Sequence, residues 1–109
     1  MNQLKIYFLY DDELSEYEAI NKGFRVDVFV KIDNQFFNLR IYDMIRLQQD
    51  FDCCIDRDGY YPVDPNLVLV TEVTKNEIVN TVKNLYTQKY FNEIKPASGV
   101  NIEKLIEII

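Results

Sequence analysis

Two neighbouring stretches in which apolar and polar side chains alternate constrain the fold of this chain most strongly. In FRVDVFVKI, residues 24–32, every second position is apolar: Phe24, Val26, Val28, Val30 and Ile32. In FFNLRIY, residues 36–42, the matching set is Phe37, Leu39 and Ile41. Because side chains in a β-strand point alternately to opposite faces, each stretch predicts a strand with one face against a core. Asp33-Asn34-Gln35 supplies turn residues between them, so we expect an antiparallel hairpin.

The parity of the two patterns predicts the register of this hairpin. Both apolar rows share one face if Val30 lies opposite Leu39 and Val28 lies opposite Ile41. Such pairing requires a loop with an even number of residues. We therefore expect either a two-residue turn at residues 34–35 or a four-residue loop.

Two more strands are predicted before and after the hairpin. Residues 3–10, QLKIYFLY, alternate in the same way. Residues 67–73, LVLVTEV, begin with a continuous apolar run, which is typical of an interior strand covered on both faces. Residues 43–66 are long enough for a crossover, so this fourth strand could run parallel to the third through a right-handed connection.

Capping residues predict the helices. Asp43 can cap a helix, and its stripe at three-to-four spacing is Met44, Leu47, Gln48, Phe51 and Ile55. Residues 74–77, TKNE, match a capping box and begin a second helix that stops by Pro96. Residues 101–109, NIEKLIEII, predict a short C-terminal helix, with a terminal strand as the alternative.

These elements predict a single α+β domain over residues 1–109. We expect a mainly antiparallel four-stranded sheet with the two main helices on one face and a short C-terminal helix. A chain of 109 residues that is 48% hydrophobic can bury a core without metal or disulfide support. Cys53 and Cys54 are adjacent, a spacing that fits neither a disulfide framework nor a CxxC metal or redox site.

Hydropathy and charge indicate where the protein acts and on what. No apolar run reaches the roughly 18 residues of a membrane span, and the N-terminus lacks the basic start and cleavage site of a secretory signal. We therefore expect a cytoplasmic protein without a membrane partner. The formal net charge is −6, and the lysines and arginines are scattered singly, so direct binding to nucleic acid is not expected. The long-range field favours cationic partners.

The composition also excludes most catalytic chemistry. The chain has no histidine, which removes the commonest general base and the commonest transition-metal ligand. Its three isolated glycines cannot form a phosphate-binding loop. Residues 50–59, DFDCCIDRDG, fail as a calcium loop, because placing Gly59 sixth puts Cys54 first and Pro65 twelfth. We expect no metal, no cofactor and no enzymatic activity, and a carboxylate-based enzyme is only the third hypothesis.

Two acidic segments containing tyrosine are the candidate binding surface. The first, YDDELSEYEAIN at residues 10–21, is predicted to be a loop with a helical turn through residues 14–20. The second surrounds the end of the helix that starts at Asp43. The simpler interpretation of both is a solvated connection. Tyrosine, however, provides rigid contact area, and carboxylates speed the encounter with a basic surface. The predicted partner-binding residues are Asp11, Asp12, Glu13, Glu16, Tyr17, Glu18, Asp56, Asp58, Tyr60 and Tyr61.

Residues 24 to about 86 also resemble a known group of proteins. RVDVFVKIDNQFFNLRIYDMIRLQQDFD and PNLVLVTEVTKNEIVNTVKNLY are similar to small cytoplasmic immunity proteins of bacterial polymorphic toxin and contact-dependent growth inhibition systems. The resemblance rests on the hairpin, the helix start and the capped helix. It implies a non-enzymatic inhibitor that binds a cognate toxin domain, often a basic nuclease. It carries over no catalytic residue.

The sequence thus leads to two function hypotheses. The first is an immunity protein that neutralises a cationic toxin domain through its acidic, tyrosine-containing surface. The alternative is a non-enzymatic adaptor or subunit domain that docks on another cellular protein through the exposed side of the hairpin, namely Phe29, Arg40 and Tyr42.

Overall fold

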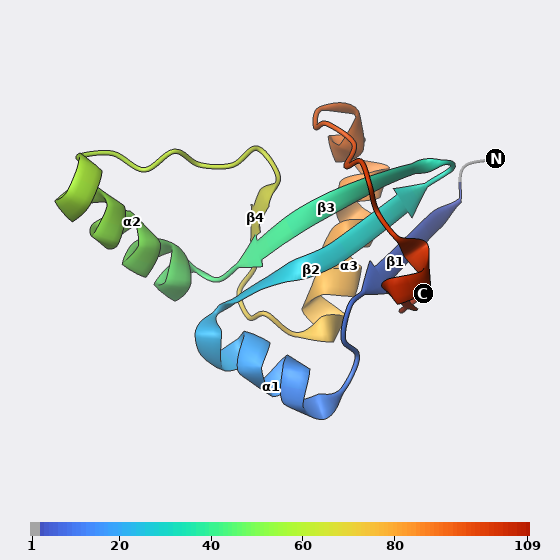
Figure 1. Ribbon diagram of the computed structural model, residues 1–109, viewed down its shortest axis with the longest axis horizontal. Helices are drawn as coiled ribbons and strands as arrows, with labels where there is room; N and C mark the ends of the chain where they lie inside the picture. Colours follow the sequence, from blue (N-terminus) through green and yellow to red (C-terminus); the bar gives the residue numbers. More distant parts are fainter. Residues whose placement is uncertain (1–2) are drawn as a thin grey trace.

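The computed structural model describes residues 3–109 as an α+β fold built on one five-stranded mixed sheet (Figure 1). The strands are β1 (Leu4–Phe8), β2 (Phe24–Ile32), β3 (Gln35–Tyr42), β4 (Leu67–Leu69) and β5 (Ile106–Glu107). The helices are α1 (Glu13–Lys22), α2 (Met44–Asp58) and α3 (Lys75–Thr87), with short 3-10 turns η1 (Tyr90–Asn92) and η2 (Ile102–Lys104). The strand order is β4-β3-β2-β1-β5, and only the β3–β4 pair is parallel. Within residues 3–109 no helix is long and apolar enough to cross a membrane.

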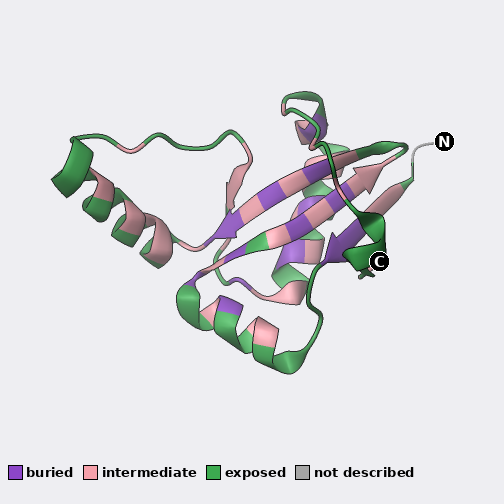
Figure 2. Cartoon of the chain, in the orientation of Figure 1, coloured by how far each residue is buried: buried purple, intermediate pink, exposed green. Residues whose placement is uncertain are grey.

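The core lies between one face of the sheet and α3. The Thr74 hydroxyl accepts a hydrogen bond from the Glu77 backbone N–H at 3.1 Å, so the predicted helix start is confirmed. Ile78 and Val82 of α3 are fully buried against the sheet. The alternating buried positions along β2 and β3 are visible as purple bands in Figure 2. Burial of this apolar surface is the main stabilising contribution to the fold.

The α+β class is confirmed, but three details of the predicted architecture are wrong. The sheet has five strands rather than four, because β5 pairs with the outer edge of β1, opposing Phe8 to Ile106. The segment expected as a C-terminal helix is therefore a 3-10 turn followed by a strand, which confirms the terminal strand given as the alternative. Its isoleucines are β-branched and suit a strand, and the Ile108 N–H donates to the Ile6 carbonyl at 2.7 Å. The stabilisation gained by pairing with the open edge of β1 is therefore larger than the helix preference that the spacing of the apolar residues indicates.

The prediction that two main helices cover one face of the sheet is also wrong. Only α3 does so, whereas no residue of α2 is buried. The chain leaves β3 at the end of the sheet, and α2 extends away from it (Figure 1). Its apolar stripe therefore cannot reach the core, although the Asp43 cap forms as expected and accepts from the Arg46 N–H at 2.8 Å.

The hairpin forms as predicted, but its register is shifted by two residues. Ile32 pairs with Gln35, so the turn is Asp33-Asn34, with Asp33 in the left-handed region at φ 56°. Val28 consequently lies opposite Leu39 rather than Ile41. A shift of two residues keeps every side chain on its predicted face, because the period of a strand is two.

A bulge in β2 changes which side chains are buried at its start. The pairing with β3 shifts between Arg25 and Val28. An extra residue in one strand reverses the alternation of side chains. Arg25 is therefore buried, with 7% of its surface exposed, whereas Val26 is 41% exposed and is not the core residue that the alternation predicts.

Candidate functional site

The acidic segment before β2 is a helix rather than a loop with one helical turn. Asp12 caps α1, and its carboxylate accepts a hydrogen bond from the Ser15 backbone N–H at 2.7 Å. This bond stabilises the charged form and lowers the pKa of the Asp12 carboxyl. Gly23 ends the helix at φ 76°, a left-handed conformation that favours glycine. The whole segment from Glu13 to Lys22 is thus one rigid element.

The inner side of α1 is attached to the rest of the fold. Ala19 is buried in the core, and a Glu16 carboxylate oxygen accepts from the Lys75 backbone N–H at 2.8 Å. The Lys75 ammonium lies 2.8 Å from an Asp11 carboxylate oxygen. Of the five carboxylates in the segment, those of Asp11, Asp12 and Glu16 therefore take part in structural contacts, and Glu18 forms only an exposed ion pair with Lys22 at 3.9 Å.

The outer side of α1 carries the exposed side chains of the helix. Leu14 and Tyr17 are 65% and 64% exposed, and they are three residues apart. Glu13 and Glu18 are exposed beside them at a spacing of four residues from Tyr17 and Leu14. We call Glu13, Leu14, Tyr17 and Glu18 the α1 outer face.

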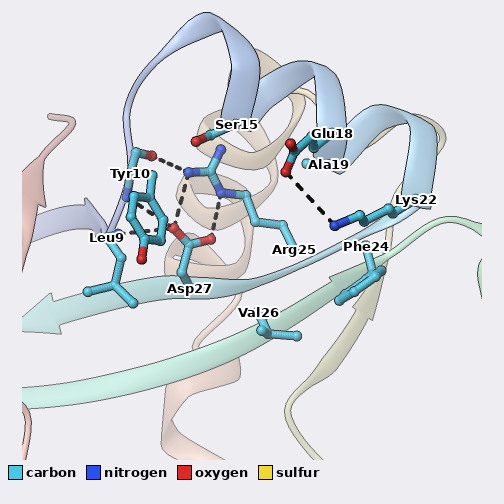
Figure 3. Close-up of a pocket in the computed structure, with 10 residues that line it drawn as sticks. All are labelled: Leu9, Tyr10, Ser15, Glu18, Ala19, Lys22, Phe24, Arg25, Val26 and Asp27. Atoms are coloured by element: carbon cyan, nitrogen blue, oxygen red, sulfur yellow. Dashed lines mark hydrogen bonds and ion pairs between the residues drawn. The ribbon is translucent and has the colours of Figure 1, made fainter.

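Beneath α1, a cavity of about 280 Å³ opens next to a buried ion pair (Figure 3). The Arg25 guanidinium lies 2.7 Å from the Asp27 carboxylate, and both side chains are largely buried. The same carboxylate accepts from the backbone N–H groups of Leu9 and Tyr10 at 3.0 and 3.4 Å, and Arg25 also donates to the Tyr10 carbonyl. These groups are hydrogen-bonded to one another, so the pair fixes the β1–α1 connection and the position of the exposed Tyr10.

The second predicted cluster lies on a separate part of the molecule. Asp56 and Asp58 are exposed at the C-terminal end of α2, where Asp58 pairs with Arg57 at 3.0 Å. Tyr60 is also exposed, whereas burial raises the pKa of the half-buried Tyr61 phenol. Figure 1 shows this end of α2 at the far left of the view and the start of α1 at the bottom, well apart from each other. The predicted site residues therefore form two surfaces rather than one.

The two helices meet at one corner of the fold. The Asp43 backbone N–H donates to the Gly23 carbonyl at 2.9 Å, which joins the end of α1 to the start of α2. The Arg46 guanidinium lies 4.4 Å from the centre of the Phe24 ring. From this corner α1 runs beneath the sheet and α2 runs away from it (Figure 1).

The predicted partner-binding residues do not include Leu14 or Tyr10, although both side chains are exposed. The signal for Leu14 was available, because an α-helix brings residues 13, 14, 17 and 18 to one side.

Among known proteins, neither a family model, nor a curated sequence, nor a solved structure matches this chain. In the part of the chain that the structure describes, no group of three or more acidic or cysteine side chains is placed to hold a metal ion.

Proposed function

We propose that this protein is an immunity protein that binds a cognate, cationic toxin domain through the α1 outer face. The observation that carries the proposal is that α1 is anchored on its inner side while Leu14 and Tyr17 stand exposed between two glutamates. The sequence resemblance to immunity proteins supports the class of partner. Inhibition would then follow from binding alone, with no chemical step.

An anchored helix is suited to tight binding. Its backbone is already ordered before a partner binds, so less of the interaction energy is offset by ordering. Tyrosine and leucine provide apolar contact area at the centre, and the carboxylates of Glu13 and Glu18 steer a basic surface toward it. The backbone of the exposed Tyr10, in the connection that leads into α1, is held by the Arg25–Asp27 pair. A complete interface of about 1,600 Å² would include residues around this face.

The test is neutralisation in cells. The product of the reading frame immediately upstream in the genome of origin is expressed with and without this protein, and growth is measured. We expect toxicity that the wild-type chain suppresses and that the double variant L14A/Y17A no longer suppresses. Ile102→Ala, which truncates an equally apolar exposed residue on η2, is the matched control and should still protect. Tyr60→Ala tells whether the end of α2 takes part.

Full protection by L14A/Y17A, with the variant folded and present at wild-type level, would contradict the assignment of the surface. A harmless upstream product that still binds the chain would instead support the adaptor hypothesis. That alternative also requires a different surface from the one expected, because Tyr42 is buried and Arg40 is paired with Asp64 at 3.4 Å.

A further inference from the structure

The apolar side of α2 is a surface that the proposed function does not use. The helix is amphipathic, yet none of its residues is buried. Met44 and Phe51 are 57% and 43% exposed, and Ile55 continues the same stripe. Figure 2 shows α2 only in the colours of intermediate and exposed residues, in contrast to α3. A stripe of this kind on a surface helix normally faces a packing partner.

A preformed groove runs along this stripe. It has a volume of about 250 Å³ and lies between α2 and the segment that returns to β4, with the lining residues Met44, Leu47, Gln48, Phe51, Tyr61 and Val63. The returning segment is held in place at its far end, where Asp64 pairs with Arg40 and the Asn66 amide donates to the Asn38 carbonyl at 2.7 Å. The groove therefore exists before any partner arrives. We call it the α2 groove.

The charges on α2 indicate which occupant suits the groove. Arg46 pairs with Asp50 at 3.1 Å, and Arg57 pairs with Asp58. Among the described residues no cation lies within ion-pair distance of Asp52 or Asp56, so the helix keeps a negative excess. A second copy of this chain would bring the same excess and a formal net charge of −6, which opposes pairing. An occupant with cationic groups beside an apolar stripe would complement both features.

We propose that the α2 groove binds the apolar face of a cationic amphipathic helix from another protein. Leucine-sized side chains of that helix would contact Phe51, Met44 and Val63. Its lysines or arginines would lie beside Asp52, whose carboxylate accepts from the amide of the groove-lining Gln48 at 2.9 Å. The mode is that of a helix laid in an apolar groove, with anchors at successive turns. This inference is independent of the α1 outer face and stands or falls separately from it.

A defined peptide pair provides the probe. An amphipathic Leu/Lys peptide of about 15 residues, the length of α2, is labelled and titrated with the protein. A Leu/Glu peptide of the same pattern serves as the charge control. We expect the Leu/Lys peptide to bind and the Leu/Glu peptide not to bind.

The decisive variant is Phe51→Asp. The substitution adds a negative charge and so strengthens any non-specific attraction between the protein and the cationic peptide. It also places a carboxylate in the apolar groove. We expect an affinity loss of about tenfold or more, as for truncation of an interface anchor. The matched control Ile102→Asp makes the same kind of change at an exposed apolar residue of η2, outside both proposed surfaces, and should bind the peptide like the wild type. Circular dichroism and urea unfolding show whether each variant is folded.

Equal or tighter peptide binding by a folded Phe51→Asp variant would overturn the proposal, because attraction would then be purely electrostatic. Sedimentation gives a second way to overturn it. If the wild type forms a dimer that Phe51→Asp abolishes, the occupant of the groove is another copy of this chain. Loss of cell protection in L14A/Y17A with intact peptide binding would separate the two surfaces experimentally.

Discussion

The two helices α1 and α2 begin and end in the same way but have different relations to the fold. Each is capped by an aspartate, Asp12 or Asp43, and each ends at a glycine in the left-handed region, Gly23 or Gly59. Both contain several carboxylates. Yet α1 buries Ala19 and is tied to the start of α3, whereas α2 buries no residue and leaves its apolar stripe in solvent.

The difference shows that charge by itself does not identify a binding surface. On α1 most carboxylates in the acidic segment cap the helix or contact Lys75, and the residues left for a partner are apolar as well as acidic. On α2 the exposed feature without a packing partner is the apolar stripe. In both helices the informative feature is an exposed apolar side chain on an element whose position is fixed elsewhere.

The largest expected effect concerns the ion pair that holds the β1–α1 connection. Asp27→Ala leaves the buried Arg25 guanidinium without its carboxylate and removes the acceptor for two backbone N–H groups. Removing one partner of such a buried pair should destabilise the fold by about 3–5 kcal/mol in urea unfolding. Glu107→Ala, which breaks the exposed pair with Lys5, should cost at most about 1 kcal/mol. Similar costs for both would contradict the structural role of Asp27.

The next effect tests the corner where the helices meet. A Cβ at residue 23 would lie 2.7 Å from the Asp43 carboxylate and 2.9 Å from the Arg46 Cβ, and the backbone there is left-handed. Gly23→Ala should therefore lower the free energy of unfolding by about 2–3 kcal/mol. Gly59→Ala has the same backbone strain but no neighbour within 4 Å, so about 1 kcal/mol is expected. Equal losses would mean that the helix contact contributes nothing.

A smaller effect distinguishes the two sides of α1. Glu16→Ala removes the carboxylate that accepts from the Lys75 N–H and should destabilise the protein by about 1–2 kcal/mol. Glu13→Ala removes a carboxylate from the α1 outer face and should change the stability by less than about 0.5 kcal/mol. For binding to the partner the order should reverse. Thermal or urea unfolding, together with a binding assay, measures both.

The stability of α2 should depend little on its apolar stripe. Phe51→Ala is expected to cost less than about 1 kcal/mol, because the ring is already 43% exposed. Phe37→Ala, a change of the same kind in the core, should cost about 3–5 kcal/mol. A large loss in the Phe51 variant would show that α2 depends on this stripe in the isolated chain.

The smallest effect is a pH dependence at the start of α1. The folded-state pKa of Asp12 is lowered from its ordinary value of 3.8, so its charge stabilises the fold above that value. This contribution is lost as the pH falls through the folded-state pKa. Asp12→Asn keeps a capping side chain without the charge, so wild type and variant should differ near pH 7 and converge in strong acid.

Much of the fold followed from the sequence, because the relevant signals are local. The hairpin alternation and the Asp43 and Thr74 caps each depend on a few neighbouring residues, and each forms as expected. The register shift and the bulge near Arg25 depend on turn geometry and on a buried ion pair with Asp27. Neither the register shift nor the bulge can be recognised from the alternation of apolar and polar residues in the sequence.

The candidate site was only partly predictable for a related reason. Sequence spacing places Tyr17 and Glu18 on one side of a helix, but it cannot tell which carboxylates meet Lys75 across the fold. The stripe of α2 has the spacing of a core helix, and only the direction in which the chain leaves β3 shows that it stays exposed. The arrangement of segments that are far apart in the sequence therefore determines which side chains are exposed on α1 and on α2.

The most direct test of the α1 outer face is the association rate with the proposed toxin, taken as the product of the reading frame immediately upstream. Stopped-flow measurements at low and high salt compare the wild type with the double variant E13K/E18K, which reverses the two carboxylates that have no structural bond to α3. The account predicts an association rate lower by about tenfold or more at low salt, with a weaker salt dependence. An unchanged rate and an unchanged salt dependence would contradict it.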